Sequence, residues 1–446
     1  MPGISAIGEE PIGADSTETS DSTTTSGGGT ATDKRIEGPL TMPTNVSFVT
    51  ADFEIKSKDS ASESTTTSAQ QILDREGEHW EGTLELPRMD REKIGPWKAF
   101  FLKLNGRVNT FKVGDPAEKF PRGSANGDPK FAGPGNAPFI ALDGDTDAVD
   151  ISKIAAYDIQ NALTVEIWVY PRNLQREQVI FSKAEGAARD EEWELGMDSD
   201  AEFYFSIGDG TENKVLSGFK PTATVPYHLA GVFDGSSVKI YVDGVEQGSK
   251  SISSTSITLA GTRVRIGGRP SGADWFEGDV SDARIWKEAR TKTEIRDNMA
   301  QALDGSETNL VGYWKLDDGS TLTATDSTSN GNDGTLKDDA NWILSNDKAF
   351  VTYGWNANQT NALKEGDNLE VADRLKSIMY DMDVNEAGIA KPEVRPQFRK
   401  EVSEGADIIT DEPKGEFRVR ESNFSWDETA PFTYKPTELL IREVAN

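Results

Sequence analysis

Cysteine is absent from the 446 residues, and histidine occurs only twice. Without cysteine the chain can have no disulfide, no thiolate metal site and no cysteine nucleophile. Neither His79 nor His228 stands beside a serine or an acid pair that would indicate a catalytic triad. His228 precedes an apolar stretch and is predicted to be a framework residue. Stability must therefore come from packing, to which a bound ion could add.

Long apolar runs are also missing. No window approaches the roughly 20 consecutive apolar residues that a membrane-spanning helix needs. The first residues, MPGISAIGEEPIG, include no basic residue and no apolar core segment, and so lack the pattern of a secretory signal peptide. We therefore expect a soluble protein with no membrane insertion.

Basic side chains are outnumbered, with 47 Lys and Arg against 76 Asp and Glu and a formal net charge of -29 at pH 7. A field of this sign repels nucleic acid and anionic membranes, so we expect no nucleic-acid partner. The simplest interpretation is an acidic surface that stays soluble in salt, where screening reduces self-repulsion. Charge alone indicates no activity.

Changes in composition divide the chain into segments. The stretch 15–34 is rich in Ser, Thr and Gly and has almost no large apolar side chain, so it cannot offset the entropy of ordering it. A Gly-, Pro- and Asn-rich stretch further on predicts a linker. The predicted segments are a disordered or extended N-terminal arm (1–36), a β-rich region (37–123), a linker (124–136), a strand-rich middle (137–346) and a C-terminal region (347–446).

Two stretches have the character of a helix. Large apolar residues with i, i+3, i+4, i+7 spacing precede Gly106, which predicts a helix that stops there. Within the strand-rich middle only residues 292–302 look helical. The apolar residues of the first helix are Trp97, Phe100, Phe101 and Leu104.

The middle of the chain has a series of short predicted strands. In the clearest, Val238–Val242 alternates between the two faces of a strand and lies between Asp234-Gly235 and Asp243-Gly244. Asp-Gly supplies the positive φ that tight hairpin turns require. Similar stretches recur at short spacing over residues 137–346, which predicts an antiparallel jelly-roll β-sandwich in a mainly β protein.

Five segments of this region also follow one another in a familiar order. They are Phe139–Asp147, Leu163–Pro171, Tyr227–Gly235, Gly278–Trp286 and Asp326–Leu336. These segments resemble successive strands of the laminin G-like, concanavalin A-like lectin domains. The resemblance implies a two-sheet jelly roll that commonly binds glycans or proteins, often with calcium.

The flanks have a different resemblance. Residues 79–116 contain a strand, a Leu-Pro turn, a Trp-containing helix and a Gly-Arg turn, and they are similar to a segment of tailed-phage structural proteins. Leu363–Leu369, Arg395–Arg399 and Gly415–Val419 resemble the second half of the same proteins. The resemblance implies that residues 37–123 and 347–446 are two parts of a smaller β-rich (α+β) virion domain.

Together the resemblances imply a virion structural protein of the tail or tail tip, with the sandwich inserted at a surface loop, where insertions are tolerated. The expected partners are other virion tail proteins, further copies of the chain and a host-surface glycan, and the expected location is the surface of the virion. Two alternatives stay open. One is a decoration or adaptor protein whose module binds a neighbouring virion protein, and the other is a glucanase. Whether the flanks form one split domain or two is also open.

The glucanase alternative rests on one segment. Glu277–Asp282 is similar to the Glu-x-Asp-x-x-Glu strand of glucanases built on the same sandwich, but Asp282 replaces the second glutamate. A retaining mechanism needs two carboxyls about 5 Å apart, one of them with a raised pKa. Because the segment also matches the non-catalytic laminin G-like strand, Asp279 and Asp282 are predicted to be turn and surface groups, and the protein is predicted not to be an enzyme.

Acidic turns suggest a calcium site. Alternate aspartates offer oxygen ligands of the kind that Ca²⁺ prefers, although Ala148 and Ile154 stand where an EF-hand needs Gly and Glu. The same residues could instead be Asx-turn residues that hold hairpins. The candidate calcium ligands are Asp143, Asp145, Asp147, Asp282, Asp326 and Asn330.

The ten Trp residues raise the question of sugar stacking, since aromatic rings pack on the apolar faces of pyranoses. Trp193 and Trp275 lie among polar residues and are the candidates for an exposed rim, together with Asp274. Core or edge packing is the alternative for each. Three others, Trp168, Trp286 and Trp314, lie within apolar stretches and are predicted to be core residues.

Overall fold

In the computed structural model, residues 36–446 form one compact unit. The structure describes residues 36, 38–57, 60–63, 70–73, 78–133, 139–184, 189–261, 263–319, 321–343, 350–396, 398, 402–420, 426–430, 433–436 and 438–444. The predicted arm, except for Ile36, lies outside the described residues. Among those residues, no helix has both the length and the apolar character to cross a membrane.

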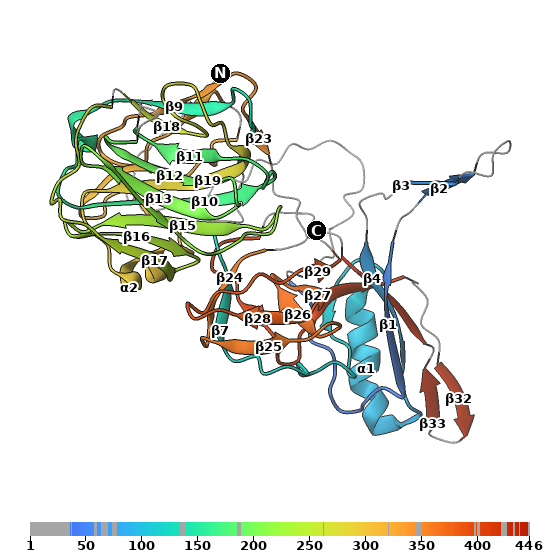
Figure 1. Cartoon of the computed structure of the whole chain (residues 1–446). Coiled ribbons are helices and arrows are strands. Elements are labelled where there is room, and N and C mark those ends of the chain that lie inside the picture. Colours follow the sequence, from blue (N-terminus) through green and yellow to red (C-terminus); the bar gives the residue numbers. More distant parts are fainter. Residues whose placement is uncertain are drawn as a thin grey trace, which may run out of the picture. The chain divides into compact units, whose positions relative to one another are not determined.

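Two antiparallel sheets form a β-sandwich (Figure 1). The first sheet has the order β17-β16-β15-β10-β19-β8-β23, with β20 also paired to β19, and the second has the order β14-β13-β12-β11-β18-β9-β22-β21. The first comprises β8 (Phe139–Asp143), β10 (Leu163–Pro171), β15 (Tyr227–Phe233), β16 (Ser237–Val242), β17 (Val245–Ser251), β19 (Glu277–Trp286), β20 (Leu310–Trp314) and β23 (Asn341–Ile343). The second comprises β9 (Ala148–Ser152), β11 (Gln178–Ser182), β12 (Trp193–Met197), β13 (Phe203–Gly208), β14 (Glu212–Leu216), β18 (Arg263–Ile266), β21 (Thr323–Ala324) and β22 (Gly334–Lys337). The mainly β jelly-roll prediction is confirmed.

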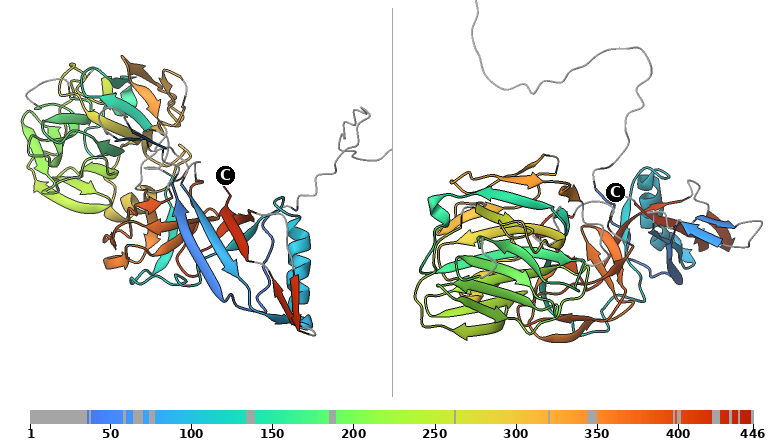
Figure 2. Two further views of the ribbon diagram at one scale, coloured as in Figure 1. Left: turned by 90° about the vertical axis from the view of Figure 1, so that its right-hand side faces the viewer. Right: turned by 45° about the horizontal axis from the view of Figure 1, so that its top comes forward.

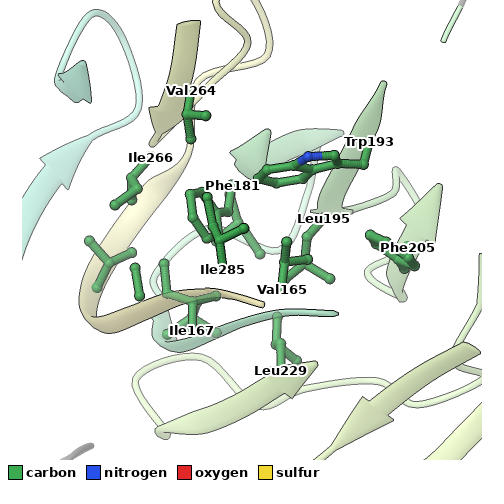
Figure 3. Packing of buried hydrophobic residues seen from close by; sticks show 14 of the residues in the cluster. Val165, Ile167, Phe181, Trp193, Leu195, Phe205, Leu229, Val264, Ile266 and Ile285 are labelled. Atoms are coloured by element: carbon green, nitrogen blue, oxygen red, sulfur yellow. The ribbon is translucent and has the colours of Figure 1, made fainter. Parts of the chain in front are cut away.

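Alternating apolar residues of the two sheets form the main core (Figure 3). Val165 and Leu229 from the first sheet and Leu195 and Phe205 from the second belong to one buried cluster. Because successive side chains of a strand point to opposite faces, the residues between them must face outward. The Asp-Gly turn after β16 has positive φ at both Asp243 (49°) and Gly244 (73°), which is the conformation that its two-residue hairpin requires.

The outer face of the first sheet is covered by a short helix, α2 (Lys292–Asn298), and the residues after it. Thr291 caps the helix with a capping box, which satisfies its first backbone donors. The Trp168 indole N–H donates to the Met299 carbonyl at 2.8 Å. Trp168, Trp286 and Trp314 are all buried. Trp314 belongs to the main core, whereas Trp168 packs with Met299 and Trp286 with Tyr313 in two smaller apolar clusters.

Strands from before and after the sandwich share another sheet, with the order β1-β4-β34-β31-β6. Its strands are β1 (Thr50–Lys56), β4 (His79–Glu85), β6 (Phe111–Val113), β31 (Gly415–Val419) and β34 (Leu439–Glu443). A helix, α1 (Arg91–Leu104), packs its buried apolar side on this sheet (Figure 2). We call β1, β4, β6, β31, β34 and α1 the flanking layer.

The predicted first helix is confirmed, but it begins earlier than the apolar spacing alone indicated. The Asp90 side chain accepts hydrogen bonds from the Glu92 and Lys93 amides, so the first turn forms ahead of the apolar stripe. The helix ends at Leu104, where Asn105 adopts a left-handed conformation with φ 49°, one residue before the predicted stop at Gly106.

Part of the predicted linker is a strand. β7 (Gly127–Phe131) pairs with β24 (Thr352–Trp355), so five residues of the predicted linker belong to a strand. The pairing partner lies more than 200 residues away in the chain, beyond what local composition can indicate. The remaining elements are β2 (Ser60–Glu63), β3 (Gln70–Leu73), β5 (Met89–Asp90), η1 (Ala155–Tyr157), β25 (Gln359–Leu363), β26 (Asn368–Val371), β27 (Arg374–Ile378), β28 (Met382–Val384), β29 (Val394–Arg395), β30 (Ile408–Ile409), β32 (Trp426–Ala430) and β33 (Thr433–Pro436).

Candidate functional site

Charged and aromatic side chains gather on the outer face of the second sheet. The neighbours of Glu194, Tyr204 and Arg265 along their strands lie in the core, so the pleat turns these three side chains outward. The turn before β19 brings Trp275 to the same group, because the Arg265 guanidinium lies 5.0 Å from its ring centroid. We call the group the outer-face cluster; its members are Asp150, Arg189, Glu194, Tyr204, Lys214, Arg263, Arg265, Arg269, Asp274 and Trp275.

Glu194 joins several members of the cluster. Its carboxylate accepts hydrogen bonds from the Tyr204 hydroxyl and from Arg269 Nε at 2.7 Å, and Arg189 Nε lies at 2.9 Å. Glu194 is only 1% exposed. Burial and the nearby negative charge of Glu194 raise the pKa of Tyr204 well above its usual value, so Tyr204 stays a neutral hydrogen-bond donor.

Trp275 is the partly exposed aromatic residue of the cluster. A Cβ at Gly268 would lie 2.8 Å from Cε3 of Trp275, so only glycine at that position lets the ring lie against the backbone. Arg265 donates to Asp150 at 2.6 Å while its guanidinium stands over the ring, a cation–π arrangement that restricts both groups.

Asp274 lies at the edge of the same cluster. Its φ is 54°, and its side chain pairs with Arg269 Nη1 at 2.8 Å. Arg269 also pairs with the central carboxylate of Glu194. The structure therefore places Asp274 and Trp275 in one network of ion pairs and ring contacts, with a planar ring, cations and carboxylates next to one another.

Trp193 is not on this face. It is 1% exposed and packs edge-to-face on Phe181, with ring centroids 5.0 Å apart. The expectation of an exposed rim residue was wrong. The acidic neighbour Glu192, which suggested a polar surface, is itself buried and pairs with the fully buried Lys183.

The predicted acidic turn uses its carboxylates as turn acceptors. Asp143 accepts a hydrogen bond from the Asp145 amide at 2.8 Å. Asp147 accepts from the Asp143 amide at 3.1 Å and from the Asp339 amide at 2.9 Å. Asp147 is 3% exposed, and burial raises its pKa.

The other predicted calcium ligands lie in two further networks. Asp326 accepts from the backbone amides of Tyr313, Thr328 and Asn332, and the Asn330 side-chain Nδ2 donates to the Val311 carbonyl at 2.8 Å. Asp282 pairs with Arg284. In the described part of the chain, no group of three or more His, Asp or Glu side chains is arranged to hold a metal. Calcium binding stays a prediction.

Sequence reasoning missed a buried ionic network beneath α2. Glu166 is fully buried and lies 3.1 Å from Arg290 Nη1 and 3.3 Å from His228 Nε2. Burial alone would raise the pKa of Glu166, but the nearby His228 ring and the charge of Arg290 outweigh it and bring the pKa to about 2. The available signal was a single charged residue in the mostly apolar strand Leu163–Pro171.

Asp282 lies in the same buried region, on β19. It is 3% exposed, and Asp279 is 8% exposed, so the prediction of surface groups was wrong for both. The Tyr313 hydroxyl donates to Asp282 at 2.9 Å, and burial raises the pKa of Asp282 despite the ion pair with Arg284. Arg284 is fully buried and also donates to the carbonyls of Asn298, at the end of α2, and Gln301.

The comparisons with known proteins concern the sandwich. Residues 143–296 match the family model of the concanavalin A-like lectin/glucanases superfamily. The expected laminin G-like domain is thereby confirmed for this part of the chain, in agreement with the two-sheet jelly roll. A fold of this superfamily is shared by glucanases and by binding modules.

Individual relatives are distant. Mouse (Mus musculus) pappalysin-1 is 23% identical over 158 residues, which cover 31% of this chain and 10% of that protein. Among solved structures, a heptameric SAP-like pentraxin from Limulus polyphemus has 17% identity and a TM-score of 0.30, covering 36% of this chain and 80% of that one. The Ruminococcus gnavus IT-sialidase CBM40, bound to α2,3 sialyllactose, has 13% identity and a TM-score of 0.30, covering 35% of this chain and 93% of that one.

Proposed function

We propose that the protein is a virion structural protein of a tailed-phage tail or tail tip, and that its sandwich binds a host-surface glycan through the outer-face cluster. The observation that supports glycan binding most directly is the partly exposed Trp275 ring, fixed against Gly268 beside Arg265 and Asp274. Sugars are bound by an aromatic surface for the pyranose face together with nearby polar groups for the hydroxyls. The cluster offers both.

Binding without catalysis is the proposal, because the carboxylates of the glucanase-like segment are engaged or buried. Glu277 accepts a hydrogen bond from Asn173 at 2.8 Å and pairs with Arg176. Asp279 pairs with Arg172 at 3.3 Å. Asp282 has a raised pKa, as a general acid requires, but it is buried beneath the residues after α2 and no substrate can reach it. A glucanase would release oligosaccharides from β-glucan, and that product would refute this part of the proposal.

Glycan binding is tested with the full chain on a glycan array, followed by titration of the best ligand. Trp275→Ala should weaken binding at least about fivefold, since removing a stacked ring from a sugar site costs about 1–3 kcal/mol by analogy with base stacking. The matched control is Trp342→Ala, which removes a partly buried ring from β23 on the other sheet. Equal affinity of the two variants, or no glycan bound by the wild type, would contradict the proposal.

The virion role is supported by the way the chain enters and leaves the sandwich. The Ala132 amide donates to the Val351 carbonyl at 3.1 Å, so the two connections lie next to each other, as an insertion requires. The flanking layer joins strands from both sides of the sandwich. We propose that this layer anchors the protein in the particle and that repeated copies convert weak single-site binding into avidity.

The insertion is tested by joining residues 36–133 to 350–446 through a short linker. If the flanks form one split domain, the fused protein should still fold and show a cooperative melting transition. Loss of cooperativity would contradict the proposed insertion. Labelling of virions with an antibody to the sandwich then tests the location. Virion incorporation without glycan binding would favour the alternative, an adaptor whose module binds a neighbouring virion protein.

A further inference from the structure

A cationic pocket lies on the flanking layer of this acidic protein. The register of β31 and β34 places Arg418 directly opposite Arg442, and Arg420 follows directly after the end of β31. Arg107 lies just after α1, and the four arginines line a cavity of about 620 Å³ together with Val419, Leu440, Glu443 and Val444. The Glu443 carboxylate is buried and accepts a hydrogen bond from the Leu375 backbone amide at 3.1 Å. We call Arg107, Arg418, Arg420 and Arg442 the arginine pocket.

The charges of the arginine pocket are only partly balanced. Glu81 accepts hydrogen bonds from Arg420 at 2.8 Å and from Arg442 at 2.6 Å. Among the described residues, no carboxylate pairs with Arg107 or Arg418, and both side chains are exposed. Like charges directly opposite each other across two strands are unfavourable, so the Arg418–Arg442 pair lowers the stability of the isolated chain.

The chemistry of the pocket specifies its ligand. A guanidinium presents a planar fork of donors that matches a carboxylate in two parallel hydrogen bonds. Two guanidiniums that pair with no carboxylate among the described residues therefore suit a segment that presents more than one carboxylate. The chain itself is rich in such segments, with 76 acidic residues against 47 basic ones.

We propose that the arginine pocket of one copy receives an acidic surface segment of a second copy of this chain, an inference that rests on the proposed role as a repeated virion component. Because the pocket is cationic at its centre, it cannot pair with itself across a two-fold axis. The contact is therefore heterologous: the pocket of one copy meets a different, acidic surface of the next. Such contacts continue from copy to copy until a ring closes.

The test measures self-association of the full chain by sedimentation velocity over a range of concentrations at low and high salt. Each copy has a net charge of -29, so salt screens the repulsion between copies as well as the pocket contact. Wild type should associate under at least one salt condition, and variants are compared with it at the same salt concentration. Arg107→Glu with Arg418→Glu should weaken association at least tenfold. The control, Arg88→Glu with Arg91→Glu, makes the same charge change at exposed positions outside the pocket and should associate as wild type does.

Two further readouts separate docking from misfolding and from glycan binding. Arg418→Glu places a carboxylate opposite Arg442, so the melting temperature of the double variant should not fall. Labelled double variant should still sediment with wild type, because it keeps the acidic surface that a wild-type pocket receives. A monomeric wild type at every concentration, unchanged association of the double variant, or no binding of the labelled variant to wild type would each overturn the proposal. Glycan binding by the double variant should persist, so this failure is distinguishable from failure of the lectin role.

Discussion

The buried network beneath α2 makes a quantitative prediction through Glu166. Replacing Glu166 with alanine removes the carboxylate that lies within 4 Å of Arg290, His228 and Arg284. Glu166, His228 and Arg284 are each fully buried, and Arg290 is 6% exposed. Water cannot replace the lost carboxylate, because α2 and the residues after it cover the site. The variant therefore keeps buried guanidinium charge with fewer partners.

The size of the effect follows from two arguments that agree. Breaking a buried ion pair by removing one partner costs about 3–5 kcal/mol. The pKa of Glu166 falls from the ordinary 4.5 to about 2 in the folded protein, and a shift of this size corresponds to about 3 kcal/mol of interaction with the ionised carboxylate. We therefore expect Glu166→Ala to lower the free energy of unfolding of the sandwich by about 3 kcal/mol or more.

The assay is urea denaturation of wild type and variant, followed by tryptophan fluorescence, with the slope of the transition compared as well as its midpoint. The matched control is Glu54→Ala, which removes the carboxylate of an ion pair with Lys56 in which both side chains are about half exposed and which should cost at most about 1 kcal/mol. A loss below about 1 kcal/mol for Glu166→Ala would refute the reasoning, because the charge would then not be buried as described.

Three other predictions concern pH, packing and metal. The Glu166 carboxylate has a lowered pKa, so its stabilisation is present above about pH 4.5 and is lost as pH falls toward 2. Between these pH values, the free energy of unfolding should therefore fall more steeply with decreasing pH in wild type than in Glu166→Ala. Parallel plots of unfolding free energy against pH would contradict this prediction. A Cβ at Gly231 would come within 2.3 Å of the Phe205 ring in the core, so Gly231→Ala should cost about 1–3 kcal/mol. The control is Gly95→Ala in α1, where no atom lies within 4 Å of the added Cβ, and it should instead stabilise the protein by about 0.5–1 kcal/mol. Similar shifts of the melting temperature in the two variants would contradict the prediction. If the acidic turns hold calcium, a chelator should lower the melting temperature. An unchanged melting temperature would contradict the prediction of a calcium site.

The sandwich strands were predictable because the information that specifies them is local. Alternation of apolar residues along Val238–Val242 and the Asp-Gly pairs on either side determine strand and turn within about ten residues, and the structure places a hairpin turn at Asp243-Gly244. The apolar spacing that predicted α1 is local in the same way. For these elements, the residue pattern within a short stretch of the chain was enough to predict the secondary structure.

The site was predictable only in part. Polar neighbours of Asp274 and Trp275 indicated a surface position, and both residues lie in the outer-face cluster. The same reasoning was wrong for Trp193, because its acidic neighbour Glu192 finds Lys183 in the interior. A polar neighbour indicates exposure only when no buried partner is available for it, and that partner is chosen by the fold.

The sequence by itself determined the period of each strand, the positions of the tight turns and the acidic character of the surface, since each depends on residues close together or on their sum. Tertiary structure alone decided which distant residues meet: Glu166 with Arg290 beneath α2, β7 with β24, and Arg418 opposite Arg442. The physical reason is that pairing across sheets depends on register and on the path of the chain, and a shift of one residue would turn every side chain of a strand to the other face.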